Sequence, residues 1–408
     1  MSYTMMQSPL MQFFDNSGKP LSFGLVYIYQ PNTTIPLTTY SVYDGSASNT
    51  NPIVLDAYGR CEIWLNSTCD VKVTDASGNL ILTQSSVSSG DMLQFNTIEA
   101  QINQLVTIIN QQLAIYQSFT LTQKALFGFG WDGTTAFSMT NLVSNTGIVA
   151  SDTTGVGSIR HDLAAAGYGG DKAIFGFGYS PSAGNVSITN LVSNMGAVAT
   201  DTTGIGTGRS DLAAASYGTD KAIFGYGITS GAVSITNLIS NAGVAASDTT
   251  GVGTARYSLA AAGYGGDKAL FGFGWTTAIV NMTNLVSNTG VVSTDTTGVG
   301  SARESLAAAG YGGDKAIFGY GYTTAAVSMT NLVSNTGVVA TDTTGVGTAR
   351  YGLAAAGYGA GKAIFGYGDT AATSSLTNLV SNTGVVATDT TGVGTARYGL
   401  AAAGYSLI

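Results

Sequence analysis

The sequence has little charge, histidine, cysteine or proline for its length. Of its 408 residues only 9% are charged, and it contains two cysteines, one histidine and six prolines. No apolar run approaches the roughly 18 residues that cross a bilayer, and the start MSYTMMQSPLMQFF lacks the basic segment of a secretory signal. The net charge of −8 offers no basic field. We therefore expect no nucleic-acid partner, no membrane insertion and synthesis in a cytoplasm.

The scarcity of histidine and cysteine also limits metal chemistry. His161 is the single histidine, and Cys61 and Cys69 both lie far from it in the sequence. The two cysteines flank a predicted turn at residues 66–68, and in a hairpin centred there they would not face each other, so no disulfide is expected. With no His/Cys cluster available, we expect no metal site and no cofactor.

Glycine, by contrast, is abundant, and its 56 copies follow a repeat. A unit of about 47 residues begins KAIFGYG, continues through VSMTNLVSNTGVVATDTTGVGTAR and ends LAAAGYGGD. It occurs six times, starting at Lys124, Lys172, Lys221, Lys268, Lys315 and Lys362. Each copy divides into four short strand-like runs, which in the fifth copy span 305–312, 315–321, 326–334 and 337–344. Four short strands per repeat predict one blade of a β-propeller.

Residue types refine this prediction. The LAAAGY run has small side chains, as expected where innermost strands crowd around an axis, and in KAIFGFG we expect Phe175 and Phe177 to share one face and pack on bare glycine backbone. The first copy lacks a LAAAGY run before it and the last lacks a KAIFGYG run after it. Residues 400–405 are therefore predicted to pair with 125–130, closing a ring of six blades with no open edge. The glycine pattern loosely resembles Kelch repeats, although the Kelch tryptophan is missing.

Residues 1–90 predict a small domain of short strands joined by turns at NSGKP, DGSAS, DAYGR and DASGN. Their sequence pattern, FFD.G.PL..G..Y.Y followed by NP..LD..GR..IWL, resembles the N-terminal particle-attaching domain of bacteriophage tail fibres and tailspikes. The matching positions are Phe14, Asp15, Gly18, Pro20, Gly24, Tyr27, Tyr29, Asn51, Pro52, Leu55, Asp56, Gly59, Arg60, Trp64 and Leu65. The resemblance implies a virion protein whose residues 1–90 attach to other phage tail proteins.

Residues 91–123 predict a helical connector. Apolar side chains recur at alternating spacings of three and four, at Phe95, Ile98, Ile102, Leu105, Ile109 and Tyr116, with Gln112 completing the stripe. A parallel coiled coil buries such a stripe, and a single amphipathic helix lying on its own chain is the alternative. The residues do not fix the strand number. The resemblance to tail fibres implies a homotrimer through 95–116.

Residues 124–408 form the predicted propeller, and variation among the copies is predicted to lie on one of its faces. The turns at YGGD and VSNTG are nearly uniform, whereas the runs after GFG or GYG and after the repeated arginine differ. Both chain ends of this region lie on the uniform face. We expect the variable face to bind a host receptor, either a glycan or a protein, because aromatic rings and acceptors suit sugars; unselected drift is the alternative. The candidate residues are Trp131, Asp132, His161, Tyr179, Tyr257, Trp275, Glu304, Tyr322, Tyr351, Asp369 and Tyr398, with Asp162 and Asp211 nearby.

The repeated charges favour a structural network, because a catalytic site would be asymmetric. Each copy has one arginine and, eight residues earlier, one aspartate: Arg160, Arg209, Arg256, Arg303, Arg350 and Arg397, and Asp152, Asp201, Asp248, Asp295, Asp342 and Asp389. An axial arginine ring that binds an anion is the functional alternative.

No enzyme is expected. A sialidase would need an acid, a Tyr/Glu pair and Asp-box turns, yet Glu304 is the only glutamate after residue 124, and a copper oxidase would need more than His161. The sequence therefore favours a phage tail fibre, located in the virion tail, that adsorbs to the host. The alternatives are a structural tail component whose propeller packs on virion proteins, and a glycan depolymerase.

Overall fold

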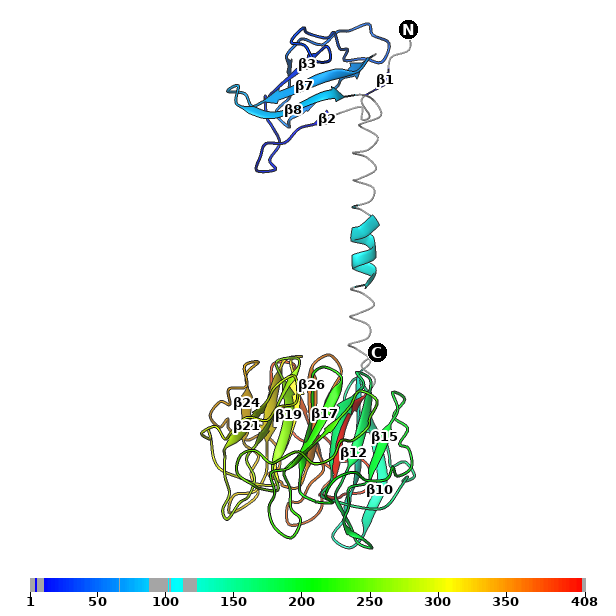
Figure 1. Ribbon diagram of the computed structural model, residues 1–408, viewed down its shortest axis with the longest axis vertical. Coiled ribbons are helices and arrows are strands. Elements are labelled where there is room, and N and C mark those ends of the chain that lie inside the picture. The colour runs from blue at the N-terminus through cyan, green and yellow to red at the C-terminus, as the bar shows by residue number, and fades with distance from the viewer. Residues whose placement is uncertain are drawn as a thin grey trace. The chain divides into compact units, whose positions relative to one another are not determined.

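The computed structural model describes residues 4–5, 11–65, 67–87, 102, 104–112 and 123–405. Within these residues the chain is mainly β, with one helix. It divides into two compact units, Met1–Ala114 and Ile115–Ile408 (Figure 1). The expected boundaries at 90 and 123 fall beside 88–101 and 113–122, which lie outside the described residues, so the three-part division stays a prediction.

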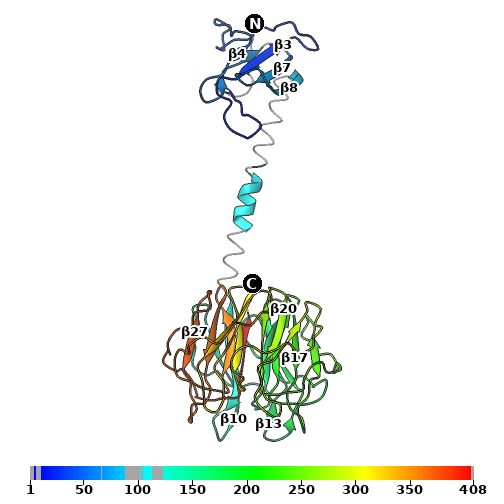
Figure 2. The ribbon, with the colours of Figure 1, turned by 90° about the vertical axis from the view of Figure 1, so that its left-hand side faces the viewer.

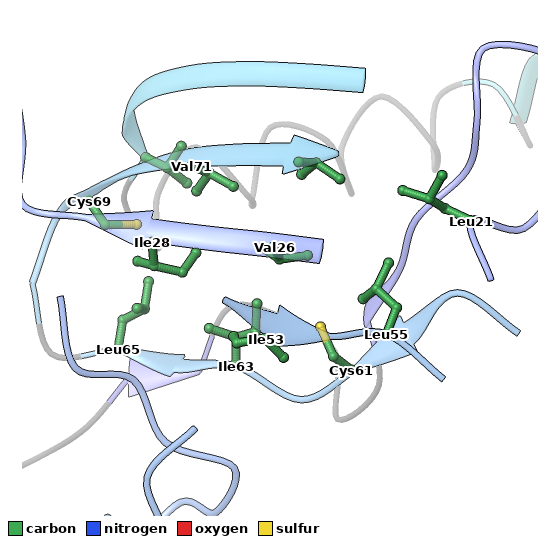
Figure 3. Packing of buried hydrophobic residues seen from close by; sticks show 12 residues of the cluster. Leu21, Val26, Ile28, Ile53, Leu55, Cys61, Ile63, Leu65, Cys69 and Val71 are labelled. Atoms are coloured by element: carbon green, nitrogen blue, oxygen red, sulfur yellow. The ribbon is translucent and has the colours of Figure 1, made fainter. Parts of the chain in front are cut away.

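The first unit is built on a four-stranded antiparallel sheet. Its strand order is β4 (Ile53–Val54), β3 (Leu25–Tyr29), β7 (Cys69–Thr74) and β8 (Leu80–Val87). Two short pairs complete it: β1 (Thr4–Met5) with β6 (Trp64–Leu65), and β2 (Met11–Gln12) with β5 (Arg60–Cys61). Alternation along β3 and β7 sends one set of side chains inward, and Figure 3 shows this core.

Three aspartates fix the turns of this unit in the same way. The Oδ1 atom of Asp15 accepts backbone N–H groups from Ser17 and Lys19 at 2.8 and 2.9 Å, and Asp56 and Asp75 repeat the pattern. Each is followed three residues later by a glycine with φ between 73° and 89°. A left-handed φ is easy for glycine, so the turns expected at NSGKP, DAYGR and DASGN are present.

The two cysteines are buried, and they are free, although not for the reason expected from the sequence. The predicted hairpin around 66–68 is wrong: β6 pairs with β1, whereas β7 pairs with β3 and β8. The cysteines therefore enter the core from separate elements (Figure 3). Burial, followed by nearby carboxylates, raises the pKa of Cys61 to about 12 and that of Cys69 to about 11. Both thiols are consequently poor nucleophiles at neutral pH.

The helix covers residues 102 and 104–112 of the connector. Its expected apolar stripe is uncovered, since Ile102, Leu105 and Ile109 are 55%, 56% and 54% exposed. Phe95, Ile98 and Tyr116, the other apolar members of the stripe, lie outside the described residues. Among the described residues, no helix is both long and apolar enough to cross a bilayer.

In the second unit, each of the six copies contributes to one three-stranded antiparallel sheet, numbered first to sixth along the chain. In order, the sheets are β28 (Ala401–Tyr405), β9 (Lys124–Trp131), β10 (Ala136–Val143); β11 (Ala164–Tyr168), β12 (Lys172–Gly176), β15 (Thr189–Val192); β16 (Ala213–Tyr217), β17 (Lys221–Gly225), β18 (Thr236–Ile239); β19 (Ala260–Tyr264), β20 (Lys268–Gly272), β21 (Thr283–Val286); β22 (Ala307–Tyr311), β23 (Lys315–Gly319), β24 (Thr330–Val333); and β25 (Ala354–Tyr358), β26 (Lys362–Gly366), β27 (Thr377–Val380). The second copy adds a hairpin of β13 (Tyr179–Ser180) and β14 (Gly184–Asn185).

The fourth run of each copy is not a strand, which corrects the expectation of four-stranded sheets. In the fifth copy it meets β24 only at two isolated bridges, Val333 with Val339 and Thr330 with Thr343. Between these bridges the side chain of Asn331 donates to the carbonyl of Ala340 at 3.0 Å and to the carboxylate of Asp342 at 2.8 Å. A side chain thus takes bonding positions that a backbone ladder would occupy.

The predicted pairing of the two ends of this unit is present. β28 pairs with β9 from Ala401 opposite Gly128 to Tyr405 opposite Lys124. The LAAAGY strands also contact one another in sequence, β28 with β11, then β16, β19, β22 and β25, and β25 contacts β28 again. Figures 1 and 2 show the strands of this unit running between its two ends.

Neighbouring sheets pack through aromatic rings and glycines. The ring of Phe175 in the second sheet lies 5.0 Å from that of Phe129 in the first, and a Cβ at Gly128 would lie 2.6 Å from the Phe175 ring. The expectation that Phe177 shares the face of Phe175 is wrong. Phe177 has φ of 63°, which turns it to the opposite face, where its ring lies 5.4 Å from that of Phe224 in the third sheet. The equivalent aromatic residue in every copy has φ between 63° and 66°.

Candidate functional site

The second unit has two distinct ends. One end holds the uniform turns after the LAAAGY strands together with both chain ends of the unit, because Lys124 begins β9 opposite Tyr405 at the end of β28. The other end holds the loops that differ between copies. We call this end the variable face and define it by residues 131–135, 161–162, 179–185, 210–211, 228–232, 257–258, 275–279, 304–305, 322–326, 351–352, 369–373 and 398–399.

Ten of the eleven candidate residues on the variable face occur in cross-strand pairs. In each copy, the residue after the repeated arginine forms a β-bridge with the residue after the GFG or GYG run, with backbone N···O distances of 2.8 to 3.1 Å. Directly opposed residues bring their side chains together. The pairs are Trp131 with Tyr398, His161 with Tyr179, Ser210 with Ile228, Tyr257 with Trp275, Glu304 with Tyr322, and Tyr351 with Asp369.

Ser210 and Ile228 form the one pair that sequence reasoning missed. Neither is aromatic or charged, so composition did not single them out, although their position in the repeat did. Asp132 is the one candidate outside the pairs. Its carboxylate Oδ1 accepts from the N–H groups of Thr134 and Thr135 at 2.8 and 2.7 Å and therefore holds its own turn. These hydrogen bonds, led by that from Thr135, lower the pKa of Asp132.

A ring of backbone hydrogen bonds lies inside the six pairs. In each copy the second residue after the arginine donates its N–H to the carbonyl of the equivalent residue in the preceding copy at 2.7 to 2.9 Å, and the first copy in the chain completes the ring by donating to the last. All six residues have φ between 52° and 60°: Asp162, Asp211, Ser258, Ser305, Gly352 and Gly399. Under them lies a cavity of about 100 Å³ that is also lined by six leucines.

Two carboxylates in this ring differ in their surroundings. Burial, and then the neighbouring carboxylate of Asp162, raises the pKa of Asp211 to about 7. Asp162 instead lies against the ring of His161, whose Nδ1 is 2.7 Å from the carboxylate oxygen Oδ2 of Asp162. Burial also raises the pKa of Glu304. The inner ring therefore contributes two carboxylates, Asp162 and Asp211, and the surrounding pairs contribute those of Glu304 and Asp369.

Aromatic contacts are unevenly distributed around the six pairs. The ring centroid of His161 lies 5.2 Å from that of Trp131 and 5.4 Å from that of Tyr179, so three side chains from two sheets are in contact. Tyr322 and Tyr351 form a second, isolated contact at 5.2 Å. Tyr179 is 42% exposed, and the other aromatic members of the pairs are half-buried.

The repeated arginines lie inside the unit and not on this face. All six have exposed fractions of 0%, so an exposed arginine ring that binds an anion is excluded. Each guanidinium stacks on the left-handed aromatic ring of the preceding sheet at 4.3 to 4.6 Å. In the fourth sheet, Arg256 Nη2 donates to Asn284 Oδ1 at 2.7 Å, and Nε donates to the carbonyl of Phe273 at 2.9 Å.

The repeated aspartates complete this network. Asp295 accepts hydrogen bonds from Thr254 and Asn284, and its Oδ1 lies 3.8 Å from Arg256 Nη1. Burial alone would raise the pKa of Asp295, but these hydrogen bonds and the arginine charge outweigh it and lower the pKa. The other five copies repeat the contact at 3.5 to 4.0 Å. Asp152 reaches Thr395 and Arg397, so the network also joins the two ends of the unit.

Among the described residues, no three or more His, Cys, Asp or Glu side chains gather so that they could hold a metal ion. The variable face presents aromatic rings and hydrogen-bonding groups on its bridged residue pairs. A scan against known protein families found no match to this chain, and a search among curated proteins also found none.

Proposed function

We propose that the second unit is a six-bladed β-propeller and that the chain is a bacteriophage tail fibre that binds a host glycan through the variable face. The propeller proposal is supported by the pairing of β28 with β9, by the circular contacts of the LAAAGY strands and by the axial ring of hydrogen bonds. Closure of this kind leaves no open sheet edge.

The receptor-binding proposal is carried by one observation. The candidate residues, which vary between copies, lie in equivalent pairs at one end of the second unit, whereas both chain ends of that unit lie at the other end. A fibre whose stalk enters at the uniform end presents its variable face away from the particle. Aromatic rings beside hydroxyl, carboxylate and imidazole groups then serve as stacking surfaces and hydrogen-bond partners for sugars.

The first unit is proposed to attach the fibre to other tail proteins. Its resemblance to particle-attaching domains is accompanied by large exposed apolar side chains. Phe23, Val54 and Tyr58 are 58%, 58% and 64% exposed, and the Phe23 N–H donates to the carbonyl of Asp56, which lies between Val54 and Tyr58 in the sequence. Exposed apolar side chains on neighbouring backbone segments are typical of protein interfaces.

The connector is proposed to form a homotrimeric coiled coil through 95–116. Support comes from the described part of the helix, where Ile102, Leu105 and Ile109 remain more than half exposed in the single chain. A short helix with one uncovered apolar stripe is stabilised by packing against copies of itself. Sedimentation analysis of the full-length protein measures the oligomeric state directly.

A steric-block experiment tests the receptor proposal. Because both native thiols are buried and have raised pKa values, a single introduced cysteine can be labelled selectively with a large maleimide polymer. Ala325→Cys places the label on the variable face of the fifth sheet, and Val338→Cys places it at the opposite end of the same sheet, where Val338 is 65% exposed.

Labelled full-length protein is then tested for adsorption to a panel of bacterial strains. We expect the unlabelled protein and the labelled Val338→Cys variant to adsorb, and the labelled Ala325→Cys variant to lose adsorption. Loss only in the Val338→Cys variant would contradict the proposed face. Absence of adsorption together with binding to purified tail proteins would favour a structural tail component, and cleavage of a surface polymer would favour a depolymerase.

A further inference from the structure

The variable face is asymmetric, although the repeat that carries it is nearly symmetric. The first and second copies have the two longest ordered loops at this end. β9 and β10 extend as eight-residue strands to the turn at Asp132, and the second copy adds the β13–β14 hairpin. Figure 2 shows β10 and β13 reaching the same end of the unit. In the other four copies the corresponding loop contains only an isolated bridge between positions four residues apart.

The three-ring contact lies between these two elaborated loops. Trp131 ends β9, Tyr179 begins β13, and His161 lies between them with ring separations of 5.2 and 5.4 Å. We call these three residues the aromatic arc. Both supports are rigid: the Asp132 carboxylate pins the first loop, and backbone bonds between His161 and Tyr179 at 2.8 and 3.0 Å pin the second.

Hydrogen-bonding groups accompany the arc. The contact between His161 Nδ1 and Asp162 Oδ2 at 2.7 Å fixes the orientation of the imidazole. Within the described residues, His161 Nε2 and the hydroxyl of Tyr179 have no hydrogen-bond partner in the protein. They are therefore available to a ligand that stacks on the arc.

The distribution of charge limits what that ligand can be. The chain has 15 lysines and arginines. Three of them, Lys19, Arg60 and Lys72, belong to the first unit, and six are the buried arginines. The remaining six are the copy-start lysines, which begin strands at the uniform end. Among the described residues the variable face thus has no lysine or exposed arginine. It carries the carboxylates of Asp162 and Asp211, which line the small cavity, and those of Glu304 and Asp369 in the surrounding pairs.

We propose that the aromatic arc is the principal ligand subsite and that it binds an uncharged glycan. This proposal rests on the proposed function of the variable face. A sugar ring stacks on Trp131, and hydroxyl groups pair with His161 Nε2 and the Tyr179 hydroxyl. An acidic polysaccharide meets carboxylates without a compensating cation, and a nucleic acid would face the same repulsion. Recognition by stacking and neutral hydrogen bonds depends little on salt.

The test uses full-length protein on a bacterial glycan array that carries neutral and acidic surface polysaccharides. The arc variant is Trp131→Ala with Tyr179→Ala. The comparison variant is Trp275→Ala with Tyr257→Ala, a bridged aromatic pair on the same face in the fourth copy. Trp275 occupies the repeat position of Trp131 and Tyr179, and Tyr257 occupies that of His161. Thermal unfolding checks that both variants keep the fold. We expect binding to neutral glycans that changes less than about twofold between 50 and 300 mM salt, a loss of at least roughly tenfold in the arc variant, and a smaller loss in the comparison variant.

The outcomes separate this inference from the proposed function. Binding that is weakened more in the comparison variant than in the arc variant, or that is confined to acidic glycans, would overturn the arc proposal while leaving the variable face as the receptor site. Binding that survives in both variants, and that the polymer label on Ala325→Cys does not block, would overturn both proposals.

Discussion

A single added methyl group tests how the sheets of the second unit pack. A Cβ at Gly272 of the fourth sheet would lie 2.7 Å from Phe318 Cζ of the fifth sheet and 3.2 Å from Thr283 Cγ2. Both contacts are shorter than ordinary van der Waals separations, and Phe318 is fully buried. Overpacking of this kind costs about 1 to 3 kcal/mol, partly offset by the smaller chain entropy that alanine loses on folding. We expect Gly272→Ala to destabilise the unit by about 1 to 2 kcal/mol.

A double-mutant cycle isolates the contact. Phe318→Leu alone removes ring volume and is expected to cost about 1 to 3 kcal/mol. In Gly272→Ala/Phe318→Leu the new methyl enters the vacated space, so we expect the double variant to be about 1 kcal/mol more stable than the sum of the single effects predicts. The free energies of unfolding are measured by denaturant titration of the full-length protein. They are taken from the transition in which the second unit unfolds.

Two comparisons complete this design. Gly231→Ala is the control, because a Cβ there has no neighbour within 4 Å, and it should change stability by less than about 0.5 kcal/mol. Gly366→Ala probes the contact between the sixth and first sheets, where a Cβ would lie 2.7 Å from Phe127 Cζ, and it should cost as much as Gly272→Ala. Additive effects in the cycle would contradict the contact between Gly272 and Phe318. A harmless Gly366→Ala beside a costly Gly272→Ala would contradict the equivalent packing of the sixth sheet on the first.

Three further predictions concern charges and the helix. Arg256→Met leaves Asn284 and the carbonyl of Phe273 without their donor, so we expect a loss of about 3 kcal/mol in unfolding free energy, and recovery of wild-type stability would contradict the network. The pKa of Asp211 is raised from 3.8 to about 7, so the folded protein keeps a proton that the unfolded chain loses, and stability falls as pH rises from about 4 to 7. Asp211→Asn should remove this fall and raise the unfolding free energy at pH 8 by up to about 4 kcal/mol. An unchanged pH profile would refute this reasoning. If the connector trimerises as proposed, Ile109→Asp should convert the trimer to monomers in sedimentation analysis, whereas Gln111→Ala should not, and a protein that is monomeric before substitution would contradict the trimer.

Sequence periodicity could predict the second unit to a large extent, because each strand type has its own residue pattern. Small residues in LAAAGY, apolar alternation in KAIFG and the displaced copy boundaries were sufficient to predict the pairing of β28 with β9. The left-handed φ of Phe177 could not be predicted in this way. Its direction depends on the stacked arginine and the next sheet, which are tertiary contacts. The fourth run was misassigned because the asparagine side chain that replaces its ladder looks, in sequence, like an ordinary strand residue.

The candidate site was predictable as a set of repeat positions but not as a geometry. Variation between copies identified the twelve paired positions, aromatic or charged side chains then selected ten of them, and the backbone bridges of the structure showed which residues oppose one another. The ring of hydrogen bonds through Asp162 and Gly399 has no sequence signature, because its donors are backbone groups of aspartate, serine or glycine. The predicted disulfide absence at Cys61 and Cys69 was correct although the hairpin behind it was wrong.

Hydrogen exchange of the full-length protein, with and without a surface polysaccharide to which it adsorbs, tests the central proposal most directly. If the variable face binds the receptor, added protection will be confined to its loops and will be strongest in residues 131–135 and 179–185. Protection located in the uniform turns of the second unit, or only in the first unit, would contradict the proposal that the variable face is the receptor site.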